Sequence, residues 1–552
     1  MSGRKLAALF TLCTLVLGAQ EAPRLGETID VSIANVDVFV TDRNGNRVRG
    51  LTRDDFEIYE NGVRKEISNF AEYASSAGNE RVGVEGVAAA QQEQVVPRQK
   101  RTMLIFLEQM RLPKHSVDPL VAELKDVVRK TIGPGDAVSI VMWSRFGGIN
   151  HVELTEDMEP IDAMLEEFGK SALRAQVNDV NQVREEAAAM REFLASVEAA
   201  AGGSSGPGGL NAEATAVMPM LVAYGEMKAR VAAITSAIHS IAGIEGKKVM
   251  LLLTRRLGEV AGIEYAYTAD APTPAHLRQR FGTERMMQEL VDAANAGGVT
   301  VYPLYAPGLG HAMPDASTNL QPDESMEWAI LANERVAMRQ IAAKTGGLTA
   351  DSTKEVVALL PRIAADVTDY YSLAYRVEAT GKDSARDITV RTRNREYVVR
   401  ARRQFVEKSD ESRMRDRLRA AFFGANHDSP IRIEAQLGDA KGSGRTRTVP
   451  LRIRIPIAAL TVIPQDRGKH AGSFSVHVGS AADLDELSDV TRKTQPFELD
   501  ASNLADAQAG FFTYDLDVQV NAKARYLAVG VFDEVSKDYG LARVALPSTE
   551  GR

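Results

Sequence analysis

Five short apolar runs divide the first two thirds of the chain, and segments with helical periodicity separate most of them. The runs are 101–112, 137–144, 247–254, 298–305 and the shorter 346–351. In the first run, RTMLIFLEQMRL, the apolar residues lead up to Glu108, where polarity returns abruptly. Such runs are typical of strands that are buried on both faces of a parallel sheet. Their alternation with helical segments predicts a doubly wound α/β domain over residues 101–368.

The helical pattern occupies six segments: 116–131, 160–169, 178–200, 213–243, 275–296 and 324–345. A loop that contains Pro and Gly, 307–323, follows the run at 298–305, and loops of this length are often functional. In doubly wound sheets, ligands bind beyond the carboxyl ends of the strands. The residues directly after Leu107 are therefore the first place to look for a functional site.

Strand-like patterns flank this domain on both sides. An N-terminal β segment, 20–73, alternates apolar and polar residues around two Asn-Gly turns, and strands return at 369–405. We expect these two segments to pack as one β-sandwich, with the α/β domain inserted between its halves. The polar stretch 74–100 is predicted to be a linker. A charged helical connector, 406–429, then leads to a second predicted β-sandwich, 430–547.

Residues 1–19 have the pattern of a secretory signal peptide. Arg4 and Lys5 precede an apolar core from Leu6 to Leu17, and small residues follow it. The core is shorter than the roughly 20 apolar residues of a transmembrane helix; an ordinary N-terminal helix is the alternative interpretation. We expect the chain to be exported, to the periplasm or outside the cell, with no transmembrane segment after signal cleavage.

Cysteine content and charge exclude several classes of chemistry. Cys13, the only cysteine, lies inside the predicted signal peptide. The mature chain would then contain no disulfide, no thiolate nucleophile and no cysteine-based metal site. A formal net charge of −8, with 44% hydrophobic and 25% charged residues, is ordinary for a globular chain and argues against nucleic acid as a partner.

The short motifs of the chain supply no catalytic chemistry. Residues 202–206 match G-x-S-x-G, but an Ala-rich segment precedes them and more glycine follows, so we interpret 199–211 as a flexible break. The stretch 42–53 begins like a calcium loop, but Arg47 and Arg53 replace its Gly and its closing Glu, which favours a hairpin turn. Glycine-rich phosphate motifs and His-Glu-x-x-His are absent. We therefore expect no catalytic residue, no cofactor and no enzyme activity.

Two longer stretches resemble the bacterial von Willebrand factor A-related family. They are VDVFVTDRNGNRVRGLTRDDFEIYENGVRKEISNF (36–70) and MRQIAAKTGGLTADSTKEVVALLPRIAADVTDYYSLAYRV (338–377), and the resemblance covers about residues 27–405. It implies a fold class of α/β plus all-β, in which a doubly wound, Rossmann-like von Willebrand A domain is flanked by β-sandwich segments. Many members of the wider fold bind Mg²⁺ at the carboxyl edge of the sheet. They use Asp-x-Ser-x-Ser after the first strand, a later Thr, and an Asp after the fourth strand.

This sequence departs from that metal-binding pattern at nearly every position. Glu108, Met110 and Leu112 stand where the Asp and the two Ser are expected, and Arg255 stands at the later Asp position, or Arg256 if the alignment moves by one. Met, Leu and Arg do not offer the hard oxygen ligands that Mg²⁺ prefers. The Thr has no clear equivalent among the nearby Ser204, Ser205 and Thr215. We predict a degenerate site that holds no metal.

The same comparison leads to a hypothesis about the sheet edge and to one about function. The strand ends at 108 and 255 are expected to be neighbours, with the guanidinium of Arg255 paired to Glu108 where a metal would be; the alternative is that both side chains face solvent. The chain is then expected to be an exported, non-catalytic interaction module for an unknown protein or envelope-surface partner. The alternatives are a metal-dependent adhesion protein with an unconventional cation site and a hydrolase with an interdomain site.

Overall fold

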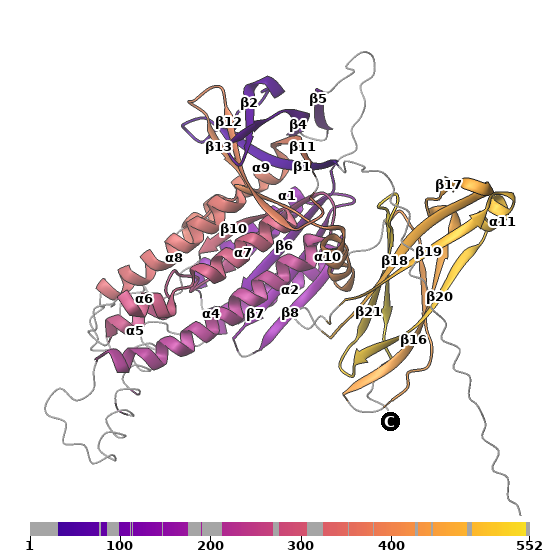
Figure 1. Ribbon diagram of the computed structural model, residues 1–552. Coiled ribbons are helices and arrows are strands. Elements are labelled where there is room, and N and C mark those ends of the chain that lie inside the picture. The colour runs from indigo at the N-terminus through magenta and orange to yellow at the C-terminus, as the bar shows by residue number, and fades with distance from the viewer. Residues whose placement is uncertain are drawn as a thin grey trace, which may run out of the picture.

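The computed structural model describes residues 31–76, 79–85, 99–174, 189, 192, 212–268, 275–305, 324–350, 353–424 and 429–547, except 111, 113, 146, 379, 443–444, 483–487 and 489. The expected combination of α/β and all-β structure is confirmed (Figure 1). Figure 1 shows one β unit above the α/β part and the C-terminal β unit beside it. The predicted signal peptide lies outside the described residues.

The α/β part is built on a sheet with strand order β10-β9-β6-β7-β8. The strands are β6 (Arg101–Glu108), β7 (Ala137–Ser144), β8 (Gly148–Thr155), β9 (Lys247–Thr254) and β10 (Val299–Tyr305). Neighbouring strands are parallel except for β8, which runs antiparallel to β7. All residues of β6, β9 and β10 are buried, which explains why these strands are continuous apolar runs.

Two features of this sheet differ from the prediction. The run 346–351 was expected to be a strand, but within its described residues it contributes only a bridge from Ala350 to Leu304. A Cβ on Gly347 would lie 1.9 Å from the carbonyl oxygen of Val301, so this stretch is a turn packed closely on β10. The additional strand is β8, whose mixed polarity suits a partly exposed edge and gave no apolar run.

Helices cover both faces of the sheet, and alternate residues of β6 belong to different cores. Met103, Ile105 and Leu107 face the core that includes α1, α2 and α9, whereas Leu104 and Phe106 face the core with α4, α7 and α8. The helices are α1 (Lys114–Thr131), α2 (Met158–Arg174), α4 (Ala212–Ala242), α5 (Ile263–Thr268), α6 (Ala275–Phe281), α7 (Glu284–Gly297), α8 (Glu324–Thr345) and α9 (Thr353–Thr368). In the described part of the chain, no helix has the length and apolar character to cross a membrane.

Strands from both sides of the α/β part form the N-terminal β-sandwich. One sheet has the order β13-β1-β11-β4-β5, and the other has the order β14-β12-β2-β3. The strands are β1 (Val31–Thr41), β2 (Phe56–Glu60), β3 (Val63–Lys65), β4 (Ile67–Ser76), β5 (Asn79–Glu85), β11 (Tyr370–Glu378), β12 (Ser384–Thr392), β13 (Val398–Ala401) and β14 (Gln404–Glu407). Because β1 pairs with β11 and β2 pairs with β12, Val36, Phe56 and Tyr371 share one apolar core.

The predicted linker 74–100 requires a correction. Strand β4 extends to Ser76, and β5 pairs with it antiparallel over residues 79–85. The sheet therefore continues past the expected boundary at residue 73, although these polar residues carry no clear strand pattern. Residues 86–98 of this segment, the break at 199–211 and the loop at 307–323 lie outside the described residues.

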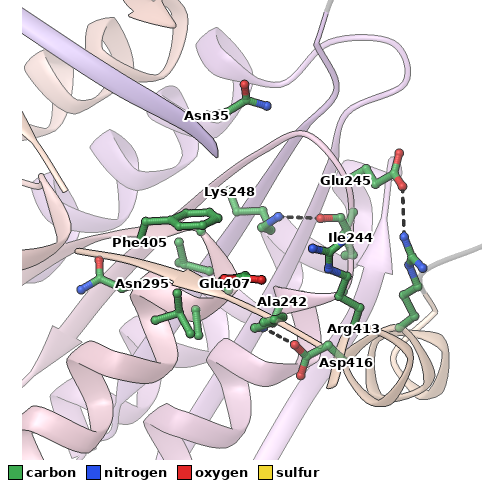
Figure 2. A pocket seen from close by; sticks show the side chains of 18 of the residues that line it. Asn35, Ala242, Ile244, Glu245, Lys248, Asn295, Phe405, Glu407, Arg413 and Asp416 are labelled. Carbon is green, nitrogen blue, oxygen red and sulfur yellow. Dashed lines mark hydrogen bonds and ion pairs between the residues drawn. The ribbon is translucent and has the colours of Figure 1, made fainter. Parts of the chain in front are cut away.

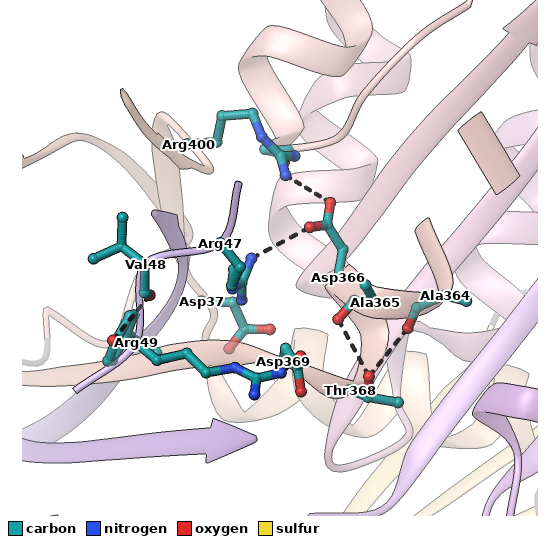
Figure 3. A network of polar contacts seen from close by, with 12 residues as sticks. Asp37, Arg47, Val48, Arg49, Ala364, Ala365, Asp366, Thr368, Asp369 and Arg400 are labelled. Atoms are coloured by element: carbon teal, nitrogen blue, oxygen red, sulfur yellow. Dashed lines mark hydrogen bonds and ion pairs between the residues drawn. The ribbon is translucent and has the colours of Figure 1, made fainter. Parts of the chain in front are cut away.

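Asp366, near the end of α9, joins the N-terminal β-sandwich to the α/β part (Figure 3). Asp366 is 5% exposed, and its carboxylate accepts hydrogen bonds from Arg400 of β13 at 2.6 Å and from Arg47 at 3.4 Å. The ammonium of Lys247, at the start of β9, donates to the carbonyl oxygen of Asp366 at 3.0 Å. Buried charges are stable only when they are paired in this way, so this network fixes the sandwich to the end of the helix.

The C-terminal part begins with α10 (Asp410–Phe422) and continues as a second β-sandwich. One sheet has the order β15-β16-β20, and the other has the order β17-β18-β21-β22 with β19 also paired to β18. The elements are β15 (Glu434–Leu437), β16 (Thr446–Pro456), β17 (Ile463–Gln465), β18 (Lys469–Ala481), β19 (Thr491–Asp500), α11 (Leu504–Gln508), β20 (Phe511–Asn521), β21 (Tyr526–Asp533) and β22 (Tyr539–Ala545). The two sheets enclose an apolar core, and α10 packs between α4 and β21.

Candidate functional site

The carboxyl edge of the central sheet brings together Glu108 and the end of β9. Glu108 is the last residue of β6, and β6 pairs with β9 up to Leu107 and Leu253. One carboxylate oxygen of Glu108, Oε2, accepts hydrogen bonds from the Thr254 hydroxyl at 2.5 Å and from the Arg255 backbone N–H at 2.9 Å. The parallel register of the two strands therefore places donors from β9 directly on the Glu108 side chain.

The second oxygen of Glu108 is held by Arg230 of α4. The Nε and Nη2 atoms of Arg230 each lie 2.9 Å from Oε1 of Glu108. The guanidinium also lies over the Trp143 ring, 5.2 Å from its centroid. Glu108 is 6% exposed and Arg230 is 5% exposed, so this is a buried ion pair.

The surroundings keep Glu108 ionised. Burial by itself raises the pKa of this carboxyl, but the charge of Arg230 and the hydrogen bonds from Arg230, Arg255 and Thr254 outweigh burial and lower the pKa below its ordinary value. Both oxygens already accept charged or strongly polar donors. A cation at this point would have to displace Arg230 from a buried site.

The two positions at which the resemblance places Ser residues are buried in the core. Met110 and Leu112 are 3% and 2% exposed and belong to the apolar core with α1 and α2. The backbone N–H of Leu112 donates to the Ala172 carbonyl at 3.1 Å, which ties this segment to α2. Their side chains fill the core and have no oxygen to offer to a metal.

Arg255 and Arg256 take part in a second group of charges beside the first. Arg256 has a left-handed backbone conformation with φ 54°, which residues other than Gly and Asn rarely adopt, so the chain turns sharply after β9. Burial lowers the pKa of Arg255, and Glu334 of α8 opposes this more strongly than Glu108 does. Among the carboxylates, Glu334 therefore acts more strongly on the charge of Arg255 than Glu108 does.

Glu334 is 4% exposed, and one of its oxygens has no hydrogen-bond partner in the described part of the chain. Burial raises the pKa of Glu334 to about 7, although Arg255, a hydrogen bond from Tyr305 and Arg256 act in the opposite direction. A cavity of about 20 Å³ beside Glu334, Arg230 and Arg256 has room for about one water molecule. Within the described residues, arginines and carboxylates therefore surround this small cavity at the edge.

The structure places Glu108 beside Arg255, and it brings a second arginine to the same carboxylate. The backbone N–H of Arg255 donates to Glu108, and the guanidinium of Arg230 forms an ion pair with it. No group of three or more His, Cys, Asp or Glu residues that could hold a metal ion occurs within the described residues. Ser204, Ser205 and the side chain of Thr215 lie outside that part.

The sequence analysis did not identify Arg230, Thr254 or Glu334. Arg230 and Glu334 each lie in helical segments that are otherwise mostly apolar, AYGEMKARVAAI and AILANERVAM. A charged residue that is buried in such a helix needs a partner of opposite charge. The position of Arg230 and Glu334 among apolar residues was therefore the sequence pattern that could have identified them. The stretch 42–53 forms the expected turn: Asp42 accepts backbone hydrogen bonds from Asn44 at 2.9 Å and Asn46 at 2.8 Å.

Comparisons with known proteins identify no family. No family model and no curated protein matches the chain. The pilus adhesin SpaC from Lactobacillus rhamnosus GG, in an open conformation, aligns over 90% of this chain and 56% of the adhesin, with 10% identity and a TM-score of 0.26. A β-glucosidase from Kluyveromyces marxianus aligns over 56% of this chain and 33% of the enzyme, with 8% identity and a TM-score of 0.12. At these TM-scores, neither alignment carries an argument about function.

Proposed function

We propose that this chain is an exported, non-catalytic interaction module of the von Willebrand factor A-related type, whose former cation site is closed by an internal ion pair. The observation that carries the proposal is the complete occupation of the Glu108 carboxylate by Arg230, Thr254 and the Arg255 backbone. With Met110 and Leu112 buried in the core, the edge lacks the oxygen ligands that Mg²⁺ requires.

The topology of the sheet supports the resemblance on which this proposal depends. A central strand β6 between β9 and β7, helices on both faces and one antiparallel edge strand form a doubly wound arrangement. The α/β part is also inserted between strands of the N-terminal β-sandwich, because β1 pairs with β11. This insertion holds the carboxyl edge on a rigid support, which suits a binding surface.

Exposed side chains lie at the ends of the strands around the closed pair. Gln109, Arg145 and Glu259 are exposed at the ends of β6, β7 and the turn after β9. Below them, the buried pair of Glu108 and Arg230 holds the strand ends, so these side chains extend from a rigid backbone. Preorganised surfaces bind with a smaller loss of conformational entropy.

Site-specific photo-crosslinking tests this proposal. A photoreactive residue at Gln109 reports on the carboxyl edge, and the same residue at Lys130, at the end of α1 and 60% exposed, is the matched control on the opposite edge. In envelope extracts, we expect discrete adducts from position 109, fewer from position 130, and no change when EDTA removes divalent cations. Equal adducts from both positions, or loss of the adducts in EDTA, would contradict the proposal.

A further inference from the structure

A cleft of about 1190 Å³ lies at the amino edge of the central sheet, opposite the closed site. The starts of β9 and β10 form its floor, and β1, β14 and α10 form its walls. Figure 2 shows Asn35, Lys248, Asn295, Phe405 and Glu407 around this space. Three parts of the molecule therefore meet at the cleft, which is a common location for small-molecule sites.

Among the described residues, two cations of the cleft have hydrogen bonds to backbone carbonyl oxygens and to no carboxylate. The Lys248 ammonium is 9% exposed and donates to the carbonyl oxygen of Ile244 at 2.6 Å (Figure 2). The Arg402 guanidinium donates to the carbonyl oxygen of Asn35 and lies over the Phe405 ring at 5.4 Å. Its Nε atom is buried and has no hydrogen-bond partner among the described residues. Both side chains therefore retain N–H donors beyond these carbonyl contacts.

The two cations converge on one point of the backbone. A Cβ on Gly298 would lie 3.6 Å from Nη1 of Arg402 and 4.0 Å from Nζ of Lys248. Gly298 has φ 65° and carries no side chain, so the space between the two donors is not filled from this position. One small group at this point would contact both charges at once.

The carboxylates that act on these cations already have partners. Asp37 and Glu245 oppose the lowering of the Lys248 pKa, which burial and the nearby charges of Lys408 and Arg402 bring to about 8. Asp37 lies 3.5 Å from the ammonium of Lys247, and Glu245 lies 3.6 Å from the Arg417 guanidinium. In the described part of the chain, neither Lys248 nor Arg402 therefore has an ion pair of its own.

Asn295 adds an unsatisfied amide to the same lining. Its side chain is 2% exposed, and neither amide atom has a hydrogen-bond partner in the described part of the chain. Buried polar groups without partners are rare and costly, and a ligand or an ordered water commonly satisfies them. Asn295 thus supplies an independent indication that the cleft accommodates a polar group.

We propose that this cleft binds a doubly charged oxyanion, a phosphate group, between Lys248 and Arg402. Two unpaired cations match the charge of a phosphate dianion, and the planar Arg402 guanidinium suits its oxygens. The cleft is far larger than a phosphate ion, so a phosphomonoester with an attached organic group also fits. Free phosphate and a phosphomonoester share this chemistry, and the experiment distinguishes them.

Isothermal titration calorimetry of the mature chain at pH 7 and constant ionic strength tests the proposal. The probes are inorganic phosphate and glycerol 2-phosphate. We expect saturable binding of at least one probe, weakened about tenfold or more in Lys248→Met and in Arg402→Met. Lys382→Met removes an exposed lysine of the same cleft and should leave the affinity unchanged. Tighter binding of glycerol 2-phosphate would identify a phosphomonoester as the preferred form, and tighter binding of phosphate would identify the free ion.

A second measurement on the unmodified chain covers the case in which a variant does not fold. Acetic anhydride acetylates lysines, and peptide mass spectrometry follows each position. Phosphate should slow acetylation of Lys248 and leave Lys382 unaffected. Absence of binding in calorimetry, equal affinity in the Lys248, Arg402 and Lys382 variants, or equal acetylation of Lys248 with and without phosphate would overturn the proposal.

Discussion

At the scale of single residues, the carboxyl edge shows a buried acid that is paired with an internal cation. Glu108 receives a guanidinium from α4, a hydroxyl from the end of β9 and a backbone N–H from the residue after β9. Groups more than 100 residues along the chain from Glu108 therefore meet on its carboxylate. Such a pair is costly to break, because the remaining charge stays buried without a partner.

Removing Arg230 tests the strength of this contact. We expect Arg230→Met to lower the free energy of unfolding of the α/β part by about 3–5 kcal/mol, because Glu108 is left as an unpaired buried charge. Trp143 and Trp328 are the only tryptophans and both belong to this part, so fluorescence during urea unfolding follows it. The double variant Glu108→Gln/Arg230→Met should regain most of the loss, since it leaves no unpaired charge. A double variant as unstable as the single one would show that the pair is not the cause.

Glu334 makes a separate prediction about pH. Its pKa of about 7 in the folded chain lies above the ordinary value of 4.5, so between these values the folded state binds a proton that the unfolded state releases. The free energy of unfolding therefore falls by about 3 kcal/mol as the pH rises from about 4.5 to 7. Glu334→Gln cannot ionise and should gain stability relative to the unmodified chain between pH 5 and pH 8. A constant difference in urea midpoints at these two pH values would refute the raised pKa.

At the scale of elements, the end of α9 connects the α/β part to the strands that flank it. Asp366 accepts from Arg400 of β13 and from Arg47 of the turn after β1, and Tyr302 of β10 also donates to it at 3.4 Å. One carboxylate thus connects two strands and a turn to the end of the helix. The relative position of the sandwich and the sheet depends on this contact.

We expect Asp366→Asn to lower the free energy of unfolding by about 3 kcal/mol, because two partly buried arginines lose their anion. The matched control is Arg129→Met, which removes the ion pair between Arg129 and Asp162. Because the Arg129 side chain is 55% exposed, this variant should lose less than about 1 kcal/mol of the free energy of unfolding. Thermal unfolding monitored by circular dichroism compares the two variants. Similar shifts of the melting temperature for both variants would indicate that the contacts of Asp366 contribute no more than an ordinary surface ion pair.

The elements that could be predicted are those whose burial is continuous. Strands β6, β7, β9 and β10 coincide closely with the apolar runs, because both faces of each strand are covered by helices. Strand β8 is an edge strand with mixed polarity, and β5, which pairs with β4, is mostly polar in sequence, so neither produced a recognisable pattern. The position of Glu108 follows from the strand end, but the contact with Arg230 depends on the rotation of α4, which a strand pattern does not determine.

At the scale of the whole molecule, α10 packs between the α/β part and the C-terminal β-sandwich (Figure 1). A Cβ on Gly243, directly after α4, would lie 2.4 Å from the backbone N of Arg417 in α10. On the other side, a Cβ on Gly530 of β21 would lie 2.1 Å from the methyl carbon of Met414. Arg543 of β22 also binds Glu153 of β8 at 2.8 and 2.6 Å, which connects the two parts directly.

Gly243→Ala is expected to loosen this docking, since α10 has to move away from α4 to make room for the methyl group. Hydrogen exchange of the α10 amides, residues 410–422, should become faster, and exchange in the N-terminal β-sandwich should not change. Gly225→Ala on the same helix is the matched control, because no atom lies within 4 Å of its Cβ position. Alanine there should stabilise α4 by about 0.5–1 kcal/mol. Unchanged exchange of the α10 amides in the Gly243 variant would contradict the close packing of α10 on α4.

Calorimetric titration of the mature chain with Mg²⁺, Mn²⁺ and Ca²⁺ tests the closed edge most directly. Because Arg230, Thr254 and the Arg255 backbone occupy both oxygens of Glu108, we expect no saturable binding of any of the three ions at this edge. Saturable binding that Glu108→Ala abolishes would contradict this expectation, and it would establish a metal-dependent site in place of the ion pair.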